Sequence, residues 1–113
     1  MSVTHGFDRH FPGHRSDALA AAWEGAKQHL TPGMPVTGVV VARYPFGAFV
    51  DIGAGFPVLL EIIEIEGLTP EEHRAGDWCP EGSRVTARVM DFQDSNRQIR
   101  VSQVRLMPGP KPA

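Results

Sequence analysis

The sequence predicts an all-β fold: a five-stranded Greek-key barrel with an N-terminal α-helix and a short helix between the third and fourth strands. Three observations predict it. Five runs rich in β-branched residues alternate between apolar and polar side chains, turn residues separate them, and two other stretches carry helix-start signals. At 113 residues the chain is expected to form one domain around a single core.

The N-terminal region is expected to hold a flexible arm followed by a helix. Residues 1–15 show no sustained periodicity, which is typical of a mobile segment. Ser16 offers an N-cap for a helix over residues 16–31, and Pro32 ends this helix because it disfavours helical geometry at the residue before it. The apolar residues at helical spacing predict the packing face: Leu19, Trp23, Ala26 and Leu30.

Three strands are predicted in the middle of the chain, from Val36 to Arg43, from Phe46 to Ile52 and over residues 57–65. Gly53-Ala54-Gly55 forms the turn before the third strand, because glycine tolerates the positive φ of tight hairpins. The third run is partly apolar on both faces, so it is either covered on both sides or ends near Glu61.

The short helix and the last two strands follow. Thr69-Pro70-Glu71-Glu72 combines an N-cap, a proline at the first helical position and two acids in the first turn. The remaining strands run from Arg84 to Met90 and from Gln98 to Ser102. This order of elements is that of the oligonucleotide-binding (OB-fold) barrel, whose second and third strands commonly form the binding face. We expect this domain over residues 33–106 and a flexible tail over 107–113.

Charge is distributed unevenly along the chain. The formal net charge is −2 with a pI near 6.2, which argues against a broad basic surface. Residues 61–82 hold seven acids and one base, whereas residues 83–113 hold six bases and two acids. The sequence therefore permits a local anion site on one side, although such runs are often only solvated faces.

Several function classes find no support in the sequence. No apolar run is long enough to span a membrane and the N-terminus lacks the apolar core of a secretory signal, so a cytoplasmic location is expected. Cys79 is the only cysteine, and His10 and His14 lack a third ligand, so neither a metal nor a cofactor is expected. No nucleophile–base pairing and no phosphate-binding glycine loop is evident, which favours a non-catalytic protein.

Aromatic side chains in the second strand point to nucleic acid. If Ala48, Val50 and Ile52 face the core, alternation directs Phe49 away from it. An outward phenylalanine ring is a possible stacking surface for a base.

Three motifs sharpen this interpretation: Gly33-x-x-Val36-x-Gly38-x-Val40, Pro45-Phe46-Gly47-Ala48-Phe49-Val50-Asp51-Ile52-Gly53, and Asn96-Arg97-x-Ile99-x-Val101-Ser102. Together they make residues 33–102, about two thirds of the chain, resemble the S1 RNA-binding domain, which occurs in a bacterial ribosomal protein and in several RNA-processing enzymes. The Phe-Gly-Ala-Phe-Val run is the most specific part.

The resemblance implies that Phe46 and Phe49 stack on single-stranded RNA bases and that Arg97 contacts the backbone. Arg100 and Arg88 join them because strand alternation directs their side chains outward. Competing interpretations are that Phe46 caps the barrel core and that the arginines of the fifth strand are solvated or pair with Asp94. The leading hypothesis is a non-catalytic protein that binds single-stranded RNA, with a ribosome or an RNA-processing protein as a further partner.

One departure from the family supports a different function. The family usually reads Gly-Leu-Val-His-Ile-Ser where this chain has Val58-Leu59-Leu60-Glu61-Ile62-Ile63, so Glu61 stands in place of a histidine that helps to bind RNA. A carboxylate there repels phosphate. The alternative is therefore a protein-interaction module on the same barrel, with its acidic block at 61–82 facing a basic partner and Ile63 and Ile65 covering a new neighbour such as Trp23.

Overall fold

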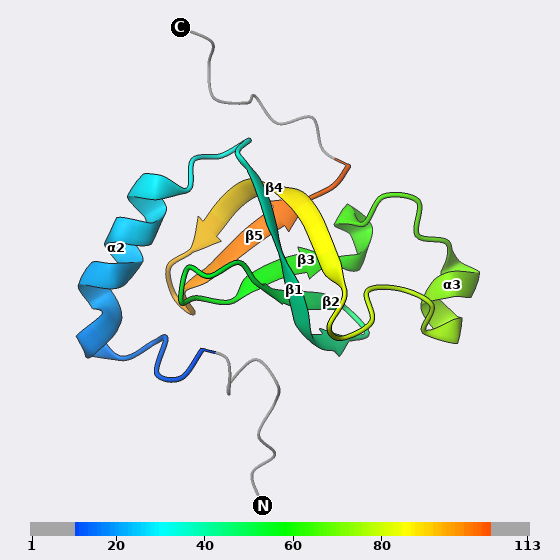
Figure 1. Ribbon diagram of the computed structural model, residues 1–113, viewed down its shortest axis with the longest axis horizontal. Helices are drawn as coiled ribbons and strands as arrows, with labels where there is room; N and C mark the ends of the chain where they lie inside the picture. Colours follow the sequence, from blue (N-terminus) through cyan, green and yellow to red (C-terminus); the bar gives the residue numbers. More distant parts are fainter. Residues whose placement is uncertain (1–10, 105–113) are drawn as a thin grey trace, which may run out of the picture.

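The computed structural model describes residues 11–104, in which five strands close into a barrel (Figure 1). The strands are Pro35–Tyr44 (β1), Gly47–Asp51 (β2), Val58–Glu61 (β3), Arg84–Gln93 (β4) and Gln98–Ser102 (β5). Their order around the barrel is β1-β2-β3-β5-β4, with β3 and β5 parallel and every other pair antiparallel. The predicted barrel and its two helices are confirmed.

The strand ends differ from the predicted ones where local geometry intervenes. β3 stops at Glu61, the shorter of the two alternatives, because the chain turns into a 3-10 helix at Ile62–Glu64. β4 continues three residues past Met90, since an irregularity between Val89 and Asp91 lets Phe92 and Gln93 pair with β5. β5 has the predicted bounds.

The core fills the interior of the barrel with the residues that alternation directs inward. Fully buried side chains come from every strand: Val40, Ala48, Val50, Val58, Leu60, Val89, Ile99 and Val101. Each buried valine, leucine or isoleucine among them stabilises the fold by about 1.5–3 kcal/mol through removal from water. A second, smaller cluster lies on the outer surface and consists of Ala42, Phe49 and Leu59 with Val41 and Tyr44 against it.

The N-terminal helix closes one end of the barrel. A 3-10 turn at Asp17–Leu19 leads into α2, Ala20–His29, and the side chain of Ser16 makes no capping hydrogen bond. The buried Trp23 ring packs edge-on against Phe56 at 5.1 Å and Phe92 at 5.9 Å between centroids. Its Nε1 donates to Oδ1 of Asp94 at 2.8 Å. The expectation that Ile63 and Ile65 cover this region was wrong for Ile63, which is 69% exposed, whereas Ile65 is partly buried and packs against the core cluster that contains Trp23.

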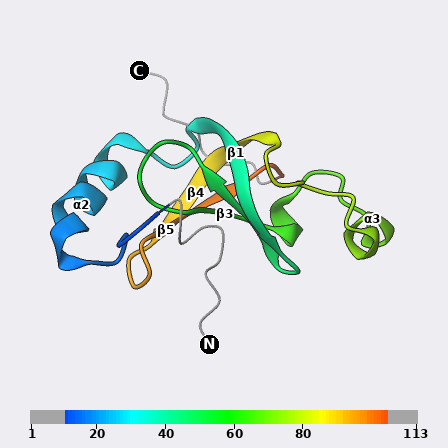
Figure 2. The same cartoon turned by 60° about the horizontal axis from the view of Figure 1, so that its bottom comes forward.

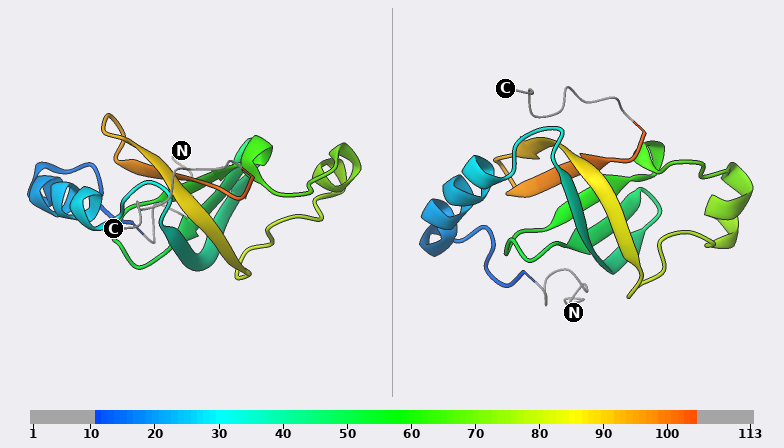
Figure 3. Two further views of the ribbon diagram at one scale, coloured as in Figure 1. Left: turned by 90° about the horizontal axis from the view of Figure 1, so that it is seen from above. Right: turned by 45° about the horizontal axis from the view of Figure 1, so that its top comes forward.

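The short helix α3, Pro70–Ala75, lies at the other end of the barrel, as Figures 2 and 3 show. Thr69 and Glu72 form a reciprocal capping box at its start, and Gly76 ends it with a φ of 76°. Arg43 of β1 holds this end in place, because its Nη1 donates to the carbonyl oxygens of Gly76 at 2.8 Å and Trp78 at 2.6 Å.

The ends of the chain limit two of the expectations. Most of the predicted arm, residues 1–10, and the whole predicted tail, residues 107–113, lie outside the described residues. Phe11 and His14, which belong to the remaining part of the arm, are buried. No helix of the described segment combines the length and apolarity needed to cross a membrane.

Candidate nucleic-acid interface

Three aromatic rings gather where β1 turns into β2, and we call them the aromatic cluster: Tyr44, Phe46 and Phe49. The rings of Tyr44 and Phe46 stack almost parallel, with centroids 5.4 Å apart and an interplanar angle of 3°. Phe49 meets both edge-on, at 5.8 Å from Tyr44 and 6.1 Å from Phe46. These separations are within the range of favourable aromatic pairs, so each ring helps to fix the others.

Phe46 is the exposed member of the aromatic cluster. Half of its surface, 51%, is accessible to solvent, so it does not cap the barrel core. Its backbone carbonyl accepts a hydrogen bond from the amide of Ile62 at 2.9 Å, which holds the backbone of Phe46 against the end of β3. A large apolar ring held in water in this way offers a flat surface to a planar ligand.

Phe49 does not stand in solvent, so that expectation was wrong. Alternation does direct it out of the core, but its side chain is only 4% exposed. Its strand partners are Ala42 on β1 and Leu59 on β3, and these apolar side chains flank the ring on the outer surface. Phe49 is therefore a buried packing partner of the exposed Phe46 ring.

Arg100 lies on the same outer surface, in register with Leu59. Its Nε and Nη2 donate to the two carboxylate oxygens of Asp91, both at 2.6 Å, and its Nη1 donates to Oε1 of Glu61 at 3.2 Å. These contacts, above all the hydrogen bond to Asp91, raise the pKa of Arg100. We call Asp91, Arg100 and Glu61 the Arg100 triad. Arg100 pairs with these two acids and not with Asp94, which instead binds Lys27 at 2.7 Å.

Arg97 lies far from the aromatic cluster. It occupies the turn before β5 with a φ of 52°, and its Nη1 donates to the carbonyl oxygens of Ser16 at 2.6 Å and His14 at 3.3 Å. Phe46 lies beside the end of β3, which runs parallel to β5. Roughly six residues, about 20 Å along the strands, therefore separate Arg97 from Phe46.

Arg88 is exposed, but it faces a different part of the barrel wall. It pairs with Pro35 on β1 and Ser102 on β5, and its Nη1 donates to the carbonyl oxygen of Gly33 at 2.7 Å. Of the three predicted arginines, the structure brings only Arg100 into the row of strand partners that contains Phe49 and Leu59.

A groove of about 370 Å³ continues from the aromatic cluster towards α3, between Tyr44 and Arg74. His73 donates from Nε2 to the carbonyl oxygen of Pro45 at 2.7 Å, and its ring stacks on Trp78 with centroids 5.4 Å apart. The guanidinium of Arg43 lies 5.1 Å from the centre of the same tryptophan ring. These residues were not predicted as part of the interface, because only the fold brings α3 to the β1–β2 turn. Tyr44 could have been predicted as part of the aromatic cluster, because it lies two residues before Phe46 in the sequence.

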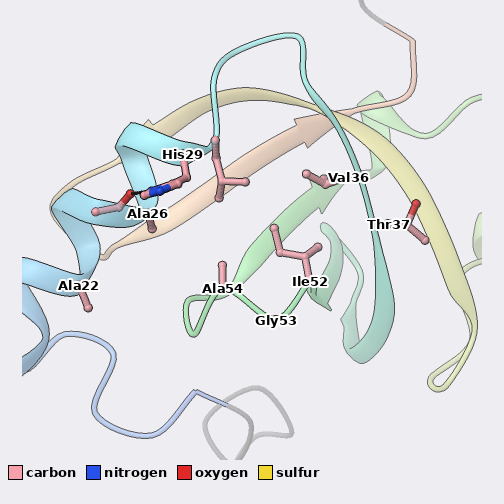
Figure 4. A pocket seen from close by; sticks show the side chains of 10 residues that line it. Ala22, Ala26, His29, Val36, Thr37, Ile52, Gly53 and Ala54 are labelled. Carbon is pink, nitrogen blue, oxygen red and sulfur yellow. Dashed lines mark hydrogen bonds between the residues drawn. The ribbon is translucent and has the colours of Figure 1, made fainter.

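A second groove, of about 410 Å³, lies between α2 and the barrel (Figure 4). Ala22 and Ala26 of α2 face Val36, Ile52 and Ala54 across it. No arginine, lysine or acid is among the described residues that line it. Apart from His29 its lining is uncharged, whereas phosphate groups require cations, so the aromatic cluster is the better candidate interface.

The described residues contain no group of three or more histidine, cysteine or acidic side chains placed to hold a metal ion.

Comparison with known proteins gives relatives of one kind. The chain is 30% identical over 84 residues to the small ribosomal subunit protein bS1 of Helicobacter pylori and 31% identical over 98 residues to the bS1 homologue of Bacillus subtilis. These matches span 74% and 84% of this chain but only 15% and 24% of the relatives. No family model matches the chain.

Solved structures share the barrel. GSP13 from Bacillus subtilis superposes with a TM-score of 0.56 at 20% identity, over 74% of this chain and 65% of that one. A chain of the a/eIF2alpha–aDim2p–rRNA complex from Pyrococcus horikoshii superposes with a TM-score of 0.52 at 26% identity, over 64% of this chain and 43% of that one. The architecture is therefore one that other proteins of known structure use.

Proposed function

Because the chain belongs to the S1 RNA-binding domain family, we propose that it binds single-stranded RNA on the outer face of β2 and β3 without catalysing a reaction. The observation that carries the proposal is the half-exposed ring of Phe46, held parallel to Tyr44 and supported by Phe49. Every base has a π-face, so this surface accepts bases with little regard to sequence through stacking.

In this proposal, arginine side chains bind the phosphate groups of the RNA. Arg100 is the predicted arginine nearest to the aromatic cluster, and 28% of its side chain is exposed. Contacts of Arg97 and Arg88 with RNA stay predictions. The guanidinium groups of both residues donate to carbonyl oxygens of the protein, and they could reach only RNA that extends beyond the face of β2 and β3. With few cations at the interface, we expect weak binding whose affinity falls as salt concentration rises.

The test replaces Phe46 with a residue that keeps its apolar character and removes its ring. For a single-stranded uridine RNA of about ten nucleotides, Phe46→Leu should weaken binding roughly 5- to 150-fold, since stacking contributes about 1–3 kcal/mol per base. Phe46→Trp is the matched control and should bind at least as well as the parent chain. Fluorescence anisotropy at two salt concentrations measures both effects.

Equal affinity of the leucine and tryptophan variants for this RNA would show that Phe46 does not stack on it. An affinity that does not change with salt concentration would show that arginine–phosphate contacts do not contribute to binding.

The ribosome is the larger assembly that the bS1 relatives suggest, and an RNA-processing protein is the alternative partner. Co-sedimentation of the parent chain with ribosomes, lost in Phe46→Leu, would favour the ribosome. A parent chain that does not sediment with ribosomes would favour the RNA-processing protein. The cytoplasmic location remains a prediction of the sequence.

A protein-interaction module is the second candidate function. It is favoured by the Arg100 triad, which places two carboxylates and one guanidinium on the proposed face and itself carries one excess negative charge. Such a face suits a basic protein segment better than a polyanion. A partner that is still retained on the immobilised chain after nuclease treatment, and lost with Phe46→Leu, would favour this second function.

A further inference from the structure

We propose that Glu61 makes this interface prefer guanine over the other RNA bases. The inference rests on the proposed binding of single-stranded RNA and adds base selectivity to the same surface. It concerns Glu61, the last residue of β3.

The fold places the end of β3 that carries Glu61 beside the backbone of the stacking residue Phe46. Glu61 is the strand partner of Gly47, the residue that follows Phe46, and the amide of Ile62 binds the Phe46 carbonyl. Glu61 also shares its face of β3 with Leu59, which packs against Phe49 on the outer surface. A base stacked on Phe46 therefore lies next to the strand end that carries this carboxylate.

The Arg100 triad holds this carboxylate in position and leaves part of it available. Asp91 occupies Nε and Nη2 of Arg100, so the remaining Nη1 points to Oε1 of Glu61 at 3.2 Å. Within residues 11–104, Oε2 of Glu61 takes part in no hydrogen bond or ion pair, and 32% of the side chain is exposed. A carboxylate has about four lone-pair sites, so both oxygens can still accept from a ligand.

Base chemistry then selects guanine. The Watson–Crick edge of guanine carries two adjacent donors, N1–H and the N2 amino group, which match the two oxygens of a carboxylate. Adenine and cytosine each present an amino donor next to a ring-nitrogen acceptor, and uracil presents one N–H between two carbonyl acceptors. An ionised carboxylate accepts and never donates, so its second oxygen meets a lone pair on each of these three bases.

The experiment varies the central nucleotide of an RNA of about nine residues whose other positions are uridine. The parent chain should bind the RNA with a central guanine at least about fivefold more tightly than those with adenine, cytosine or uracil, as a bidentate contact predicts. In Glu61→Gln, which keeps the shape of the side chain but replaces one acceptor oxygen by a donor, this ratio should fall to within about twofold of unity.

Glu81→Gln is the matched control. Glu81 is exposed in the loop before β4, so its replacement removes one negative charge without touching the interface. It should raise the affinity for all four RNAs by a similar factor and keep the guanine preference. Thermal unfolding of each variant verifies that the barrel is intact.

Equal binding of all four RNAs by the parent chain would overturn the inference, and so would a guanine preference that persists in Glu61→Gln. Either result leaves RNA binding through Phe46 standing. If the parent chain binds none of the RNAs, the proposed function fails, and the guanine preference fails with it.

Discussion

Arg100 allows two carboxylates to lie close together on one outer face of the barrel. Its guanidinium donates three hydrogen bonds, two to Asp91 and one to Glu61, in the planar fork geometry that favours carboxylate pairs. The half-buried position of the arginine limits solvent screening of these contacts. Arg100 is therefore first a structural cation, and its availability to phosphate is limited by the acids it holds.

Arg100→Lys should lower the free energy of unfolding by about 1–2 kcal/mol, because an ammonium group cannot make the two-pronged contact with Asp91. Chemical denaturation at neutral pH measures this loss. Arg84→Lys, at an exposed position of β4, is the control and should change stability by less than about 0.5 kcal/mol. Similar losses in both variants would show that the fork geometry contributes nothing.

Phe49 shows which property of a single residue can be predicted from sequence. Alternation gave its direction correctly, since Ala48 and Val50 on either side are in the core. Its exposure depends on Ala42 and Leu59, which only the strand pairing brings beside it. The exposure of a side chain on the barrel wall depends on the residues of the neighbouring strands. It therefore cannot be predicted from the alternation within one strand.

At the scale of the elements, β1 and β2 approach so closely that one position of β1 has no room for a side chain. A Cβ atom on Gly38 would lie 2.8 Å from side-chain atoms of Val50 and Ile52, and would also collide with the carbonyl oxygen of Asp51. Gly25 in α2 is the opposite case, because an added Cβ meets nothing within 4 Å there.

Gly38→Ala should therefore destabilise the barrel by about 2 kcal/mol or more, as overpacking of a core does. Gly25→Ala should stabilise the protein by about 0.5–1 kcal/mol, since alanine loses less backbone freedom in a helix. Thermal unfolding of the two variants tests both signs. An unchanged midpoint for Gly38→Ala would mean that the strands can separate at no cost.

The elements themselves were largely predictable, and their connections were not. Local signals marked α3 through its capping box at Thr69 and Glu72, and the start and end of β5 through a turn and an alternating run. Arg97 lies in the turn before β5 with a positive φ, and its Nη1 donates to the carbonyl oxygen of Ser16, a placement that strand alternation does not predict. A positive φ at a residue other than glycine produces no periodic pattern in the sequence, so it could not be predicted here.

At the scale of the whole molecule, α2 is attached to the barrel through Asp94 in the β4–β5 turn. Trp23 and Lys27 both donate to Oδ1 of this aspartate, at 2.8 and 2.7 Å. These hydrogen bonds, that from Lys27 first, hold the pKa of Asp94 below its ordinary value. A carboxyl group with a lowered pKa stabilises the folded state above its unfolded pKa, and this contribution is lost as the pH falls through the folded pKa.

Asp94→Asn should therefore be less stable than the parent chain at neutral pH, and the difference should shrink as the pH falls into the acidic range below the ordinary aspartate pKa. Thermal unfolding followed by tryptophan fluorescence at a series of pH values measures it. A stability difference that stays constant down to the lowest pH at which the chain folds would contradict this attachment.

The acidic block predicted from the sequence does not lie wholly on the surface of the molecule. Glu64 is buried, Glu61 pairs with Arg100, and Glu72 is engaged in the cap of α3. Sequence position shows how many charges a segment carries, but folding distributes them over the core, the interface and a helix end. The strength of the predicted electrostatic asymmetry was for this reason not accessible from the sequence.

The parallel pairing of β3 with β5 completes the ring of strands and leaves no open sheet edge among the described residues. Another polypeptide cannot extend such a ring by adding a strand of its own, so any association must use side chains. Several copies of this unit can consequently follow one another along a polypeptide without exchanging strands, each presenting its ring of Phe46 independently.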